Sequence, residues 1–447
     1  MAKKAAGKPE KKAKYTGSES EGGITSSYAM SDGVRLKVPY SFMGSIYDQE
    51  EEKAVLAAMK QDSLTMGPQV KLFQSEFAAK HDVKHAFAVS NCTVGMHLCT
   101  QLFDIRKGDE VIVTPITFIA TTLVILKEGA IPVYADIDPR TFNIDPKDIA
   151  KKITPRTKAI YVVHYGGLIC DMDPIMELAR KHKLYVLEDC AHAPNAEYKG
   201  RKAGSIGDVG VFSFHSLKNM TTLGEGGMIT TNHDEWVKPI EALRCMNLDQ
   251  WPADQKMFKF GPHTLEKSTK YDYWIPAHYD VNDVNGHWGN NYRMNELQAA
   301  VGRTQVRKLD MLTDKRREIG HAITAGIKGI KGITPVFEPE GYRHVFHLYT
   351  LCVEEAELGA GRDDFLRVLY VEEGVQGILH YQPTYHFTGL KKLGITANCP
   401  NAEKFFYKRE LNLPMHPRLT RTDVESITKG IRSAAEKVRK GHRVKQD

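Results

Sequence analysis

The chain has 447 residues, of which 42% are hydrophobic and 26% charged. This composition is typical of a globular protein with a substantial core, and the length suits two or three folding units. No apolar run reaches the roughly 20 residues that span a bilayer, and no apolar stretch follows the N-terminal lysines. We therefore expect neither a membrane span nor a secretory signal.

The formal net charge of +6 would suit a nucleic-acid partner, but its distribution argues against one. Residues 1–14 contain six lysines and a single acid, Glu10, so they carry almost all of the excess charge. We interpret residues 1–35 as a disordered basic tail. The remainder is nearly balanced, and we expect no nucleic-acid partner.

The seven cysteines are scattered along the chain and include no CxxC pair. An odd, dispersed set favours reduced thiols and a cytoplasmic protein over a disulfide framework. The same spacing lacks the clustered ligands of a structural zinc site, so we expect no metal.

Strand-like and helical patterns alternate through the first half of the chain. Order is expected to begin near Val38. The alternation is typical of an α/β fold with a mostly parallel, doubly wound sheet. The predicted strands are 86–89, 110–113, 131–135, 159–163 and 184–187, and the predicted helices are 48–59, 70–80, 94–102, 121–128 and 173–181.

The second half of the chain is less regular. Residues 245–290 interrupt the alternation and predict a long irregular insertion, after which helical spacing covers 291–325. We expect a large α/β domain at 36–320, which contains the insertion. A smaller α+β domain at 321–447 is expected to end in a basic helix near 424–439.

Polar residues follow several of the predicted strands. Ser90, Thr117, His164 and Asp189 each come just after such a strand. Ligands of doubly wound sheets bind beyond the carboxyl ends of the strands, where these side chains would meet on one rim.

Lys218 stands out because it lies between an apolar run and a glycine-rich turn. Imine formation requires a neutral amine, which apolar surroundings favour. A buried carboxylate such as Asp189 can keep a pyridine nitrogen protonated. Each residue also has an ordinary interpretation, as a surface charge and as a helix cap respectively.

Three further features admit two interpretations each. Ser213 and the turn 90–93 place hydroxyls and backbone amides at strand ends, where they suit either a phosphate dianion or an ordinary helix cap. Phe118 could stack on a flat ring or belong to the core.

The order of these signals resembles the DegT/StrS-type sugar aminotransferases, which are fold-type I enzymes dependent on pyridoxal 5'-phosphate (PLP) and similar to aspartate aminotransferase. The resemblance covers about residues 40–440. It implies a large domain around a mostly parallel seven-stranded sheet, a smaller C-terminal α+β domain, and PLP as cofactor. The segments that carry it are Thr65–Pro68, Ser90–Thr93, Gly108–Val113, Thr117–Thr121, Glu188–Ala193, Phe212–Gly227 and Asn291–Ala300.

The resemblance also implies roles for individual residues. Lys218 would form the imine with PLP and then move a proton between substrate and cofactor, and Asp189 would pair with the pyridine nitrogen. Asn291 matches a residue that reaches the phosphate from a neighbouring subunit, which implies a homodimer with shared active sites. The other matched positions are His192 near the ring hydroxyl, Phe118 on the ring face, Cys92, Thr93, Val94 and Ser213 at the phosphate, and Thr65, His380, Tyr385 and His386 on the substrate side.

The reaction implied is transamination, because dehydratase relatives carry histidine in place of Lys218. An amino group would pass from L-glutamate or L-glutamine to a keto sugar, expected to be nucleotide-linked. A keto-cyclitol such as a keto-inositol is an alternative acceptor. A non-catalytic PLP-binding regulator is a third hypothesis, which the lack of a helix-turn-helix within residues 1–40 disfavours.

Three departures from the family pattern concern the acceptor side. Leu223 adds one residue to the usual Lys-Asn-x-Thr-Thr-Gly-Glu-Gly-Gly sequence. The 245–290 segment is longer than usual. Many relatives place histidine where Tyr385 stands, so whether Tyr385 or His386 faces the acceptor is open.

Overall fold

The computed structural model describes residues 34–247 and 281–444. The tail predicted at 1–35, apart from its last two residues, and most of the 245–290 insertion lie outside the described residues. All seven cysteines lie within them, and each is buried and free. None of the helices in the described ranges is both long and apolar enough to cross a membrane.

A seven-stranded sheet forms the centre of the fold, with strand order β1-β9-β8-β5-β4-β2-β3. Strand β9 runs antiparallel to both of its neighbours, and the other pairs are parallel. The predicted mostly parallel seven-stranded sheet is therefore confirmed. Its strands are β1 (His85–Val89), β2 (Glu110–Val113), β3 (Ile131–Tyr134), β4 (Thr157–Val163), β5 (Tyr185–Asp189), β8 (Val209–Ser213) and β9 (Gly227–Thr231).

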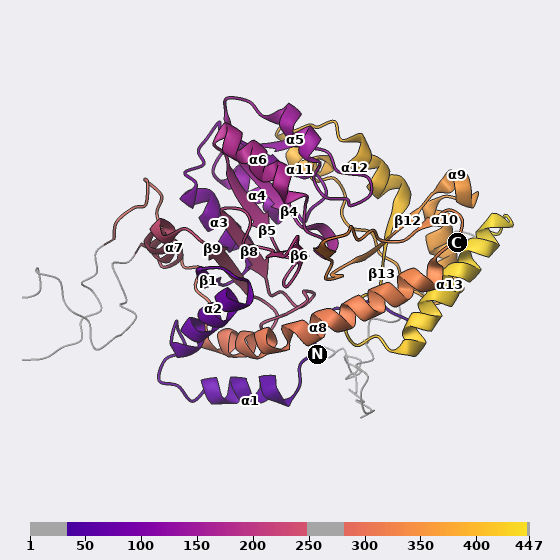
Figure 1. The fold of residues 1–447 in the computed structure, drawn as a ribbon, viewed down its shortest axis with the longest axis horizontal. Coiled ribbons are helices and arrows are strands. Elements are labelled where there is room, and N and C mark those ends of the chain that lie inside the picture. Colours follow the sequence, from indigo (N-terminus) through magenta and orange to yellow (C-terminus); the bar gives the residue numbers. More distant parts are fainter. Residues whose placement is uncertain (1–33, 248–280, 445–447) are drawn as a thin grey trace, which may run out of the picture.

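Helices cover both faces of this sheet (Figure 1). Successive strand residues point to opposite faces, so Phe87 and Val89 of β1 join one core while Ala86 and Ala88 join the other. The first core also contains residues of α3 (Cys92–Leu102), α4 (Ala120–Lys127) and α7 (Val237–Arg244). The second contains residues of α2 (Pro68–Lys80), α5 (Pro146–Lys152), α6 (Met172–His182) and α8 (Glu296–Ile327).

The C-terminal part builds a third core around a small sheet of order β10-β12-β13. Val38, near the start of the described chain, is buried in this core and pairs with Val375. The C-terminal part comprises β10 (Ile333–Thr334), β12 (Tyr349–Val353), α9 (Glu355–Leu358), α10 (Arg362–Val371), α11 (Thr388–Lys392), α12 (Pro400–Lys404), β13 (Glu410–Leu413) and α13 (Arg421–Arg439).

Several short elements complete the described chain. Helix α1 (Gln49–Ala58) begins at the capping box of Asp48 and Glu51. A further sheet of order β11-β6-β7 joins Tyr342–Arg343, Glu197–Tyr198 and Arg201–Lys202. Single helical turns occur at Tyr165–Gly167, Asp234–Trp236 and Thr384–His386, and a π-helical turn at Phe405–Arg409.

Helix α8 runs beneath both parts of the molecule (Figure 1). Its first half packs in the core of the large sheet, whereas Ile319, Ile323 and Ile327 of its second half pack in the C-terminal core. Arg316, fully buried near its middle, donates to the backbone oxygens of Gly44, Phe346 and Met415. One helix therefore ties three distant segments together.

Candidate active site

A cavity of about 550 Å³ lies beyond the carboxyl ends of the strands. The large sheet contributes Asp189 at the end of β5 and Ser213 at the end of β8. The C-terminal part contributes His347, His380 and Tyr381. The N-terminal segment adds Tyr40, Ser41 and Gly44, so three stretches far apart in the sequence enclose one space.

Lys218 lines this cavity from the loop after β8 and is half-buried. Its backbone N–H donates to the carbonyl of His215 at 2.8 Å, which closes a turn. Burial lowers the pKa of Lys218 below its usual 10.5, although Asp189 and Cys92 act in the opposite direction. The result is an amine that is neutral more readily than a surface lysine, as a nucleophile requires.

Asp189 is buried at the last position of β5 and faces the same cavity. One carboxylate oxygen accepts from the Ala191 N–H at 3.0 Å and the other from the Thr121 hydroxyl at 2.9 Å. Burial raises the pKa of Asp189 despite these bonds. A cationic ring nitrogen in the cavity would offset that penalty and keep the carboxyl ionised.

The first turn of helix α3 forms another wall, through Cys92, Thr93 and Val94. The Asn91 side chain caps the helix by accepting from the Val94 N–H at 3.0 Å. Strand β9 approaches this turn closely at Gly227, where an added Cβ would lie 2.6 Å from the Asn91 carbonyl carbon. Glycine is needed there because any side chain would displace the helix N-terminus.

Two histidines stand side by side in the cavity wall. The rings of His192 and His347 have centroids 4.2 Å apart, and burial lowers the pKa of each well below 6.5. The Asn219 amide donates to the Val345 carbonyl at 3.1 Å, so its oxygen accepts from Nδ1 of His347 at 3.1 Å. Both imidazoles are therefore neutral, with defined tautomers.

The cavity's residues supply what PLP needs. Lys218 offers a neutral amine for the aldehyde, and Asp189 a buried carboxylate for the ring nitrogen. The start of α3 and Ser213 offer amides and a hydroxyl for the phosphate. Phe118 lies on the cavity rim and is 59% exposed, as a ring-stacking residue would be before its partner binds.

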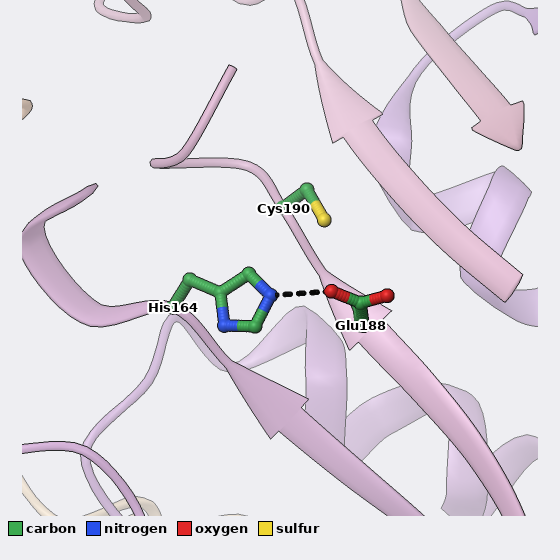
Figure 2. A group of neighbouring side chains, drawn as sticks. All are labelled: His164, Glu188 and Cys190. Carbon is green, nitrogen blue, oxygen red and sulfur yellow. Dashed lines mark hydrogen bonds and ion pairs between the residues drawn. The ribbon is translucent and has the colours of Figure 1, made fainter. Parts of the chain in front are cut away.

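One cluster near the site has the composition of a metal centre. His164, Glu188 and Cys190 bring potential ligand atoms within 4.8 Å of one another (Figure 2). However, Nδ1 of His164 accepts from the Cys170 N–H, so Nε2 carries the proton and donates to Glu188 at 2.8 Å. The Glu188 carboxylate also accepts three backbone amides, from Gly204, Ile206 and Gly207. These bonds occupy the ligand atoms of His164 and Glu188, so the two side chains act as a structural brace.

A model of the DegT/DnrJ/EryC1/StrS aminotransferase family matches residues 45–432. The chain belongs to this family. It is accordingly an aminotransferase, as its resemblance to the family predicts, and members of the family depend on PLP.

Several proteins similar to this aminotransferase have names that state a biosynthetic role. The spore coat polysaccharide biosynthesis protein SpsC of Bacillus subtilis is 37% identical over 404 residues, which cover 88% of this chain and 96% of SpsC. GDP-perosamine synthase of Caulobacter vibrioides is 37% identical over 387 residues, covering 85% and 94%. The solved structure of Helicobacter pylori PseC, an aminotransferase in pseudoaminic acid biosynthesis, matches with a TM-score of 0.78, 28% identity and coverage of 89% and 99%.

The aminotransferase cavity brings together most of the predicted cofactor residues and one predicted substrate residue. His380 and the cofactor set all line it, with the exception of Asn291. Asn291 is exposed and accepts a hydrogen bond from Arg293 at 2.9 Å. Thr65 is also exposed and pairs with Asn295.

Neither Tyr385 nor His386 lines the cavity in this chain. Tyr385 is buried and donates to Glu403 at 2.9 Å, while His386 bonds the Tyr407 hydroxyl at 2.7 Å. From the same motif, Tyr381 enters the cavity instead.

The inserted Leu223 gives its loop an unusual backbone. The φ angle of Leu223 is 58°, which is in the left-handed region, and the residue is 46% exposed. The Leu223 N–H donates to the Tyr47 hydroxyl at 2.7 Å, which anchors the loop to the N-terminal segment. This hydrogen bond holds the loop in a defined conformation. The left-handed backbone at Leu223 costs about 1–2 kcal/mol, because the residue is not glycine.

Sequence reasoning missed four cavity or supporting residues: Tyr40, Thr121, His347 and Tyr381. Thr121 belongs to a segment that carries the family resemblance, and Tyr381 belongs to the motif predicted to face the acceptor. Their presence could have been noted, but which neighbour in each motif points inward depends on the tertiary structure.

Proposed function

We propose that this aminotransferase binds PLP through Lys218 and transfers an amino group from L-glutamate or L-glutamine to a nucleotide-linked keto sugar. The observation that carries the proposal is the half-buried Lys218 amine, with its lowered pKa, sharing one cavity with the buried Asp189 carboxylate. PLP would supply an electron sink next to the substrate carbon that gains or loses the amine.

Each residue's role follows from its surroundings. The Lys218 amine binds the cofactor's aldehyde and, once released, carries a proton to and from the substrate carbon. Asp189, held by Thr121 and Ala191, keeps the ring nitrogen protonated. The first turn of α3 and Ser213 hold the phosphate, because amides at a helix start lack intrahelical partners.

The acceptor class is supported by the relatives. Their printed names include a polysaccharide biosynthesis protein and a synthase of GDP-perosamine, a nucleotide-linked amino sugar. The cavity volume of about 550 Å³ is within the range of small-molecule sites. A keto-cyclitol has no comparable support among the observations.

A homodimer with shared active sites is part of the proposal. Asn291 lies outside this chain's own cavity, which suits a residue that serves a neighbouring copy. Trp288, close to it in sequence, is 65% exposed, and Phe118 at the cavity rim is 59% exposed. A second copy would cover such apolar surfaces.

Spectroscopy of the purified protein tests the cofactor. Wild type mixed with PLP should show a visible absorption band that Lys218→Ala abolishes. Lys429→Ala, which removes a lysine with 82% side-chain exposure, should keep the band. A wild-type protein without the band, or a band that survives Lys218→Ala, would overturn PLP binding through this residue.

Half-reactions test the substrates. The band should be consumed by L-glutamate or L-glutamine and restored by a keto sugar nucleotide. Faster restoration by a keto-inositol would replace the proposed acceptor. An absence of turnover with every donor, together with salt-sensitive DNA binding, would instead favour the regulator.

A further inference from the structure

Tyr381 occupies the cavity wall between two residues already assigned to the cofactor. Its ring lies nearly parallel to that of His192, at 21° with centroids 6.0 Å apart. It meets the Phe118 ring edge-on, at 63° and 6.4 Å. Among the described residues, its hydroxyl has a single hydrogen-bond partner, Nε2 of His192 at 3.4 Å.

The direction of that hydrogen bond can be deduced. The Gly166 N–H donates to Nδ1 of His192 at 3.3 Å, so Nδ1 carries no proton. Burial lowers the pKa of His192 well below 6.5, so the imidazole is neutral and its proton resides on Nε2. The Tyr381 oxygen is therefore the acceptor, which leaves its own O–H without an acceptor in the part of the chain that the structure describes.

The pair is poorly matched by itself. Its separation of 3.4 Å exceeds the 2.7–3.2 Å that is usual for N–H···O bonds, and burial raises the pKa of Tyr381 far above 10.0, so the phenol keeps its proton. Two neutral donors, the His192 N–H and the Tyr381 O–H, thus border one wall of the cavity. An oxygen atom between them could accept from both.

We infer that Tyr381 is a further cofactor-binding residue, whose hydroxyl donates together with the His192 N–H to one oxygen, the ring phenol oxygen of PLP. The inference rests on the proposed function, because it presupposes PLP in this cavity. It extends the cofactor site to the segment 378–386 of the C-terminal part.

The backbone of this segment is held in place before any ligand binds. The carbonyl of His380 accepts from the Tyr165 hydroxyl at 2.7 Å, and its N–H donates to Glu410 at 2.9 Å. Tyr165 and Glu410 are both buried. The backbone from which the Tyr381 side chain projects is therefore anchored by buried groups, which helps to position a specific donor.

A donor at the ring oxygen has a measurable electronic effect. A hydrogen bond to the ionised phenol oxygen of PLP would stabilise the negative charge on that oxygen. The oxygen would then attract less strongly a proton that it shares with the Lys218 nitrogen, so the pKa of that proton would be lower. Further titratable side chains line this space and are the same in all variants compared. They include Lys218, Asp189, His347, His380 and Tyr40. Loss of the Tyr381 donor should therefore raise the pH at which the visible band of the PLP-bound enzyme changes.

The test is a spectrophotometric pH titration of the PLP-bound enzyme. We expect Tyr381→Phe to raise the midpoint by about one pH unit and to weaken PLP binding about 3- to 10-fold. Tyr349→Phe is the matched control, since it removes a buried hydroxyl that bonds Thr324 at 2.8 Å outside the cavity. The control should titrate as wild type does.

The remaining outcomes separate this inference from the proposed function. A Tyr381→Phe midpoint equal to that of wild type, with a raised KM for the acceptor, would overturn the inference and assign the hydroxyl to the acceptor. Equal shifts in both variants would overturn it as well. A wild type without a visible band would overturn the proposed function instead.

A second variant covers the case in which Tyr381→Phe does not fold. Site-specific 3-fluorotyrosine at position 381 keeps the ring and the donor but makes the hydroxyl more acidic, hence a stronger donor. The midpoint should then fall below that of wild type. An unchanged midpoint would overturn the inference.

Discussion

The strand ends of the large sheet and the segment 378–386 both contribute residues to the cavity, yet they position side chains differently. At the strand ends, the backbone ladder determines direction: Glu188 and Asp189 are adjacent on β5, so they point to opposite faces. In the segment, His380 is held by side-chain bonds to Glu410 and Tyr165. The residues at the strand ends are thus positioned by regular structure, and His380 by individual hydrogen bonds.

This difference predicts how each region tolerates substitution. A change at a strand end leaves the ladder intact, so it should alter chemistry more than stability. A change in the network behind the segment removes what holds the backbone, so it should alter stability and ligand binding together.

Asp189→Asn should lower the rate of the half-reaction with L-glutamate by about 100-fold or more, because the ring nitrogen loses its charged partner. The visible band and the free energy of unfolding should change little, since β5 remains paired on both sides. Stopped-flow absorbance and urea denaturation measure the two quantities. A rate within threefold of wild type would contradict the assigned role.

Gly227→Ala should weaken PLP binding about 10-fold, because the added methyl would lie 2.6 to 2.8 Å from backbone atoms of Asn91 and Cys92 and displace the start of α3. Equilibrium titration with PLP measures the loss. Gly389→Ala is the control, since no atom lies within 4 Å of its added Cβ. Equal affinity in the two variants would mean that the helix start does not contact the cofactor.

Glu410→Ala should lower the free energy of unfolding by about 1–3 kcal/mol, because it leaves the His380 N–H and the Asn412 amide without their acceptor. The KM for the acceptor should rise as the segment loosens, while the visible band persists. Urea denaturation and steady-state kinetics measure these effects. A stable variant with unchanged KM would show that the segment is held by other contacts.

Glu410 also gives a pH-dependent prediction. Burial raises its pKa well above the usual 4.5. A carboxyl with a raised folded-state pKa contributes its stability in full below the unfolded pKa and loses it as pH rises through the folded pKa. Wild type should therefore lose stability relative to Glu410→Gln as pH rises from about 4.5, which thermal melting at several pH values can measure.

Thr121→Val should have the smallest effect, about a threefold slower half-reaction, because it removes one of two hydrogen bonds to Asp189. Single-turnover kinetics measure the change. An effect as large as that of Asp189→Asn would mean that Thr121 acts directly on the ligand.

Much of the cofactor side could be predicted from sequence because local patterns encode it. Strand β2 occupies the predicted residues 110–113, and β5 ends at Asp189, two residues beyond the apolar run that predicts it. Fully buried strands give continuous apolar runs that are easy to recognise. Lys218 was identifiable from its apolar flanks and the turn that follows it.

The orientations in the segment 378–386 could not be predicted in the same way. Tyr381, Tyr385 and His386 share one motif, and nothing local distinguishes their directions. Tyr385 points away from the cavity because its hydroxyl donates a hydrogen bond to Glu403 on α12. Tyr381 points into the cavity beside His192. His164 shows the same limit at a strand end, since it pairs with Glu188 rather than joining the cavity. Contacts distant in sequence decide these orientations.

Helix α8 has a consequence for how ligands enter. Its 32 residues form one uninterrupted rod of about 48 Å, with apolar side chains in the cores of both parts. A hinge motion between those parts would have to bend this rod and break the three Arg316 bonds at its middle. Entry and exit should therefore depend on loops at the cavity mouth, such as the one that carries Leu223, with the framework staying rigid through the catalytic cycle.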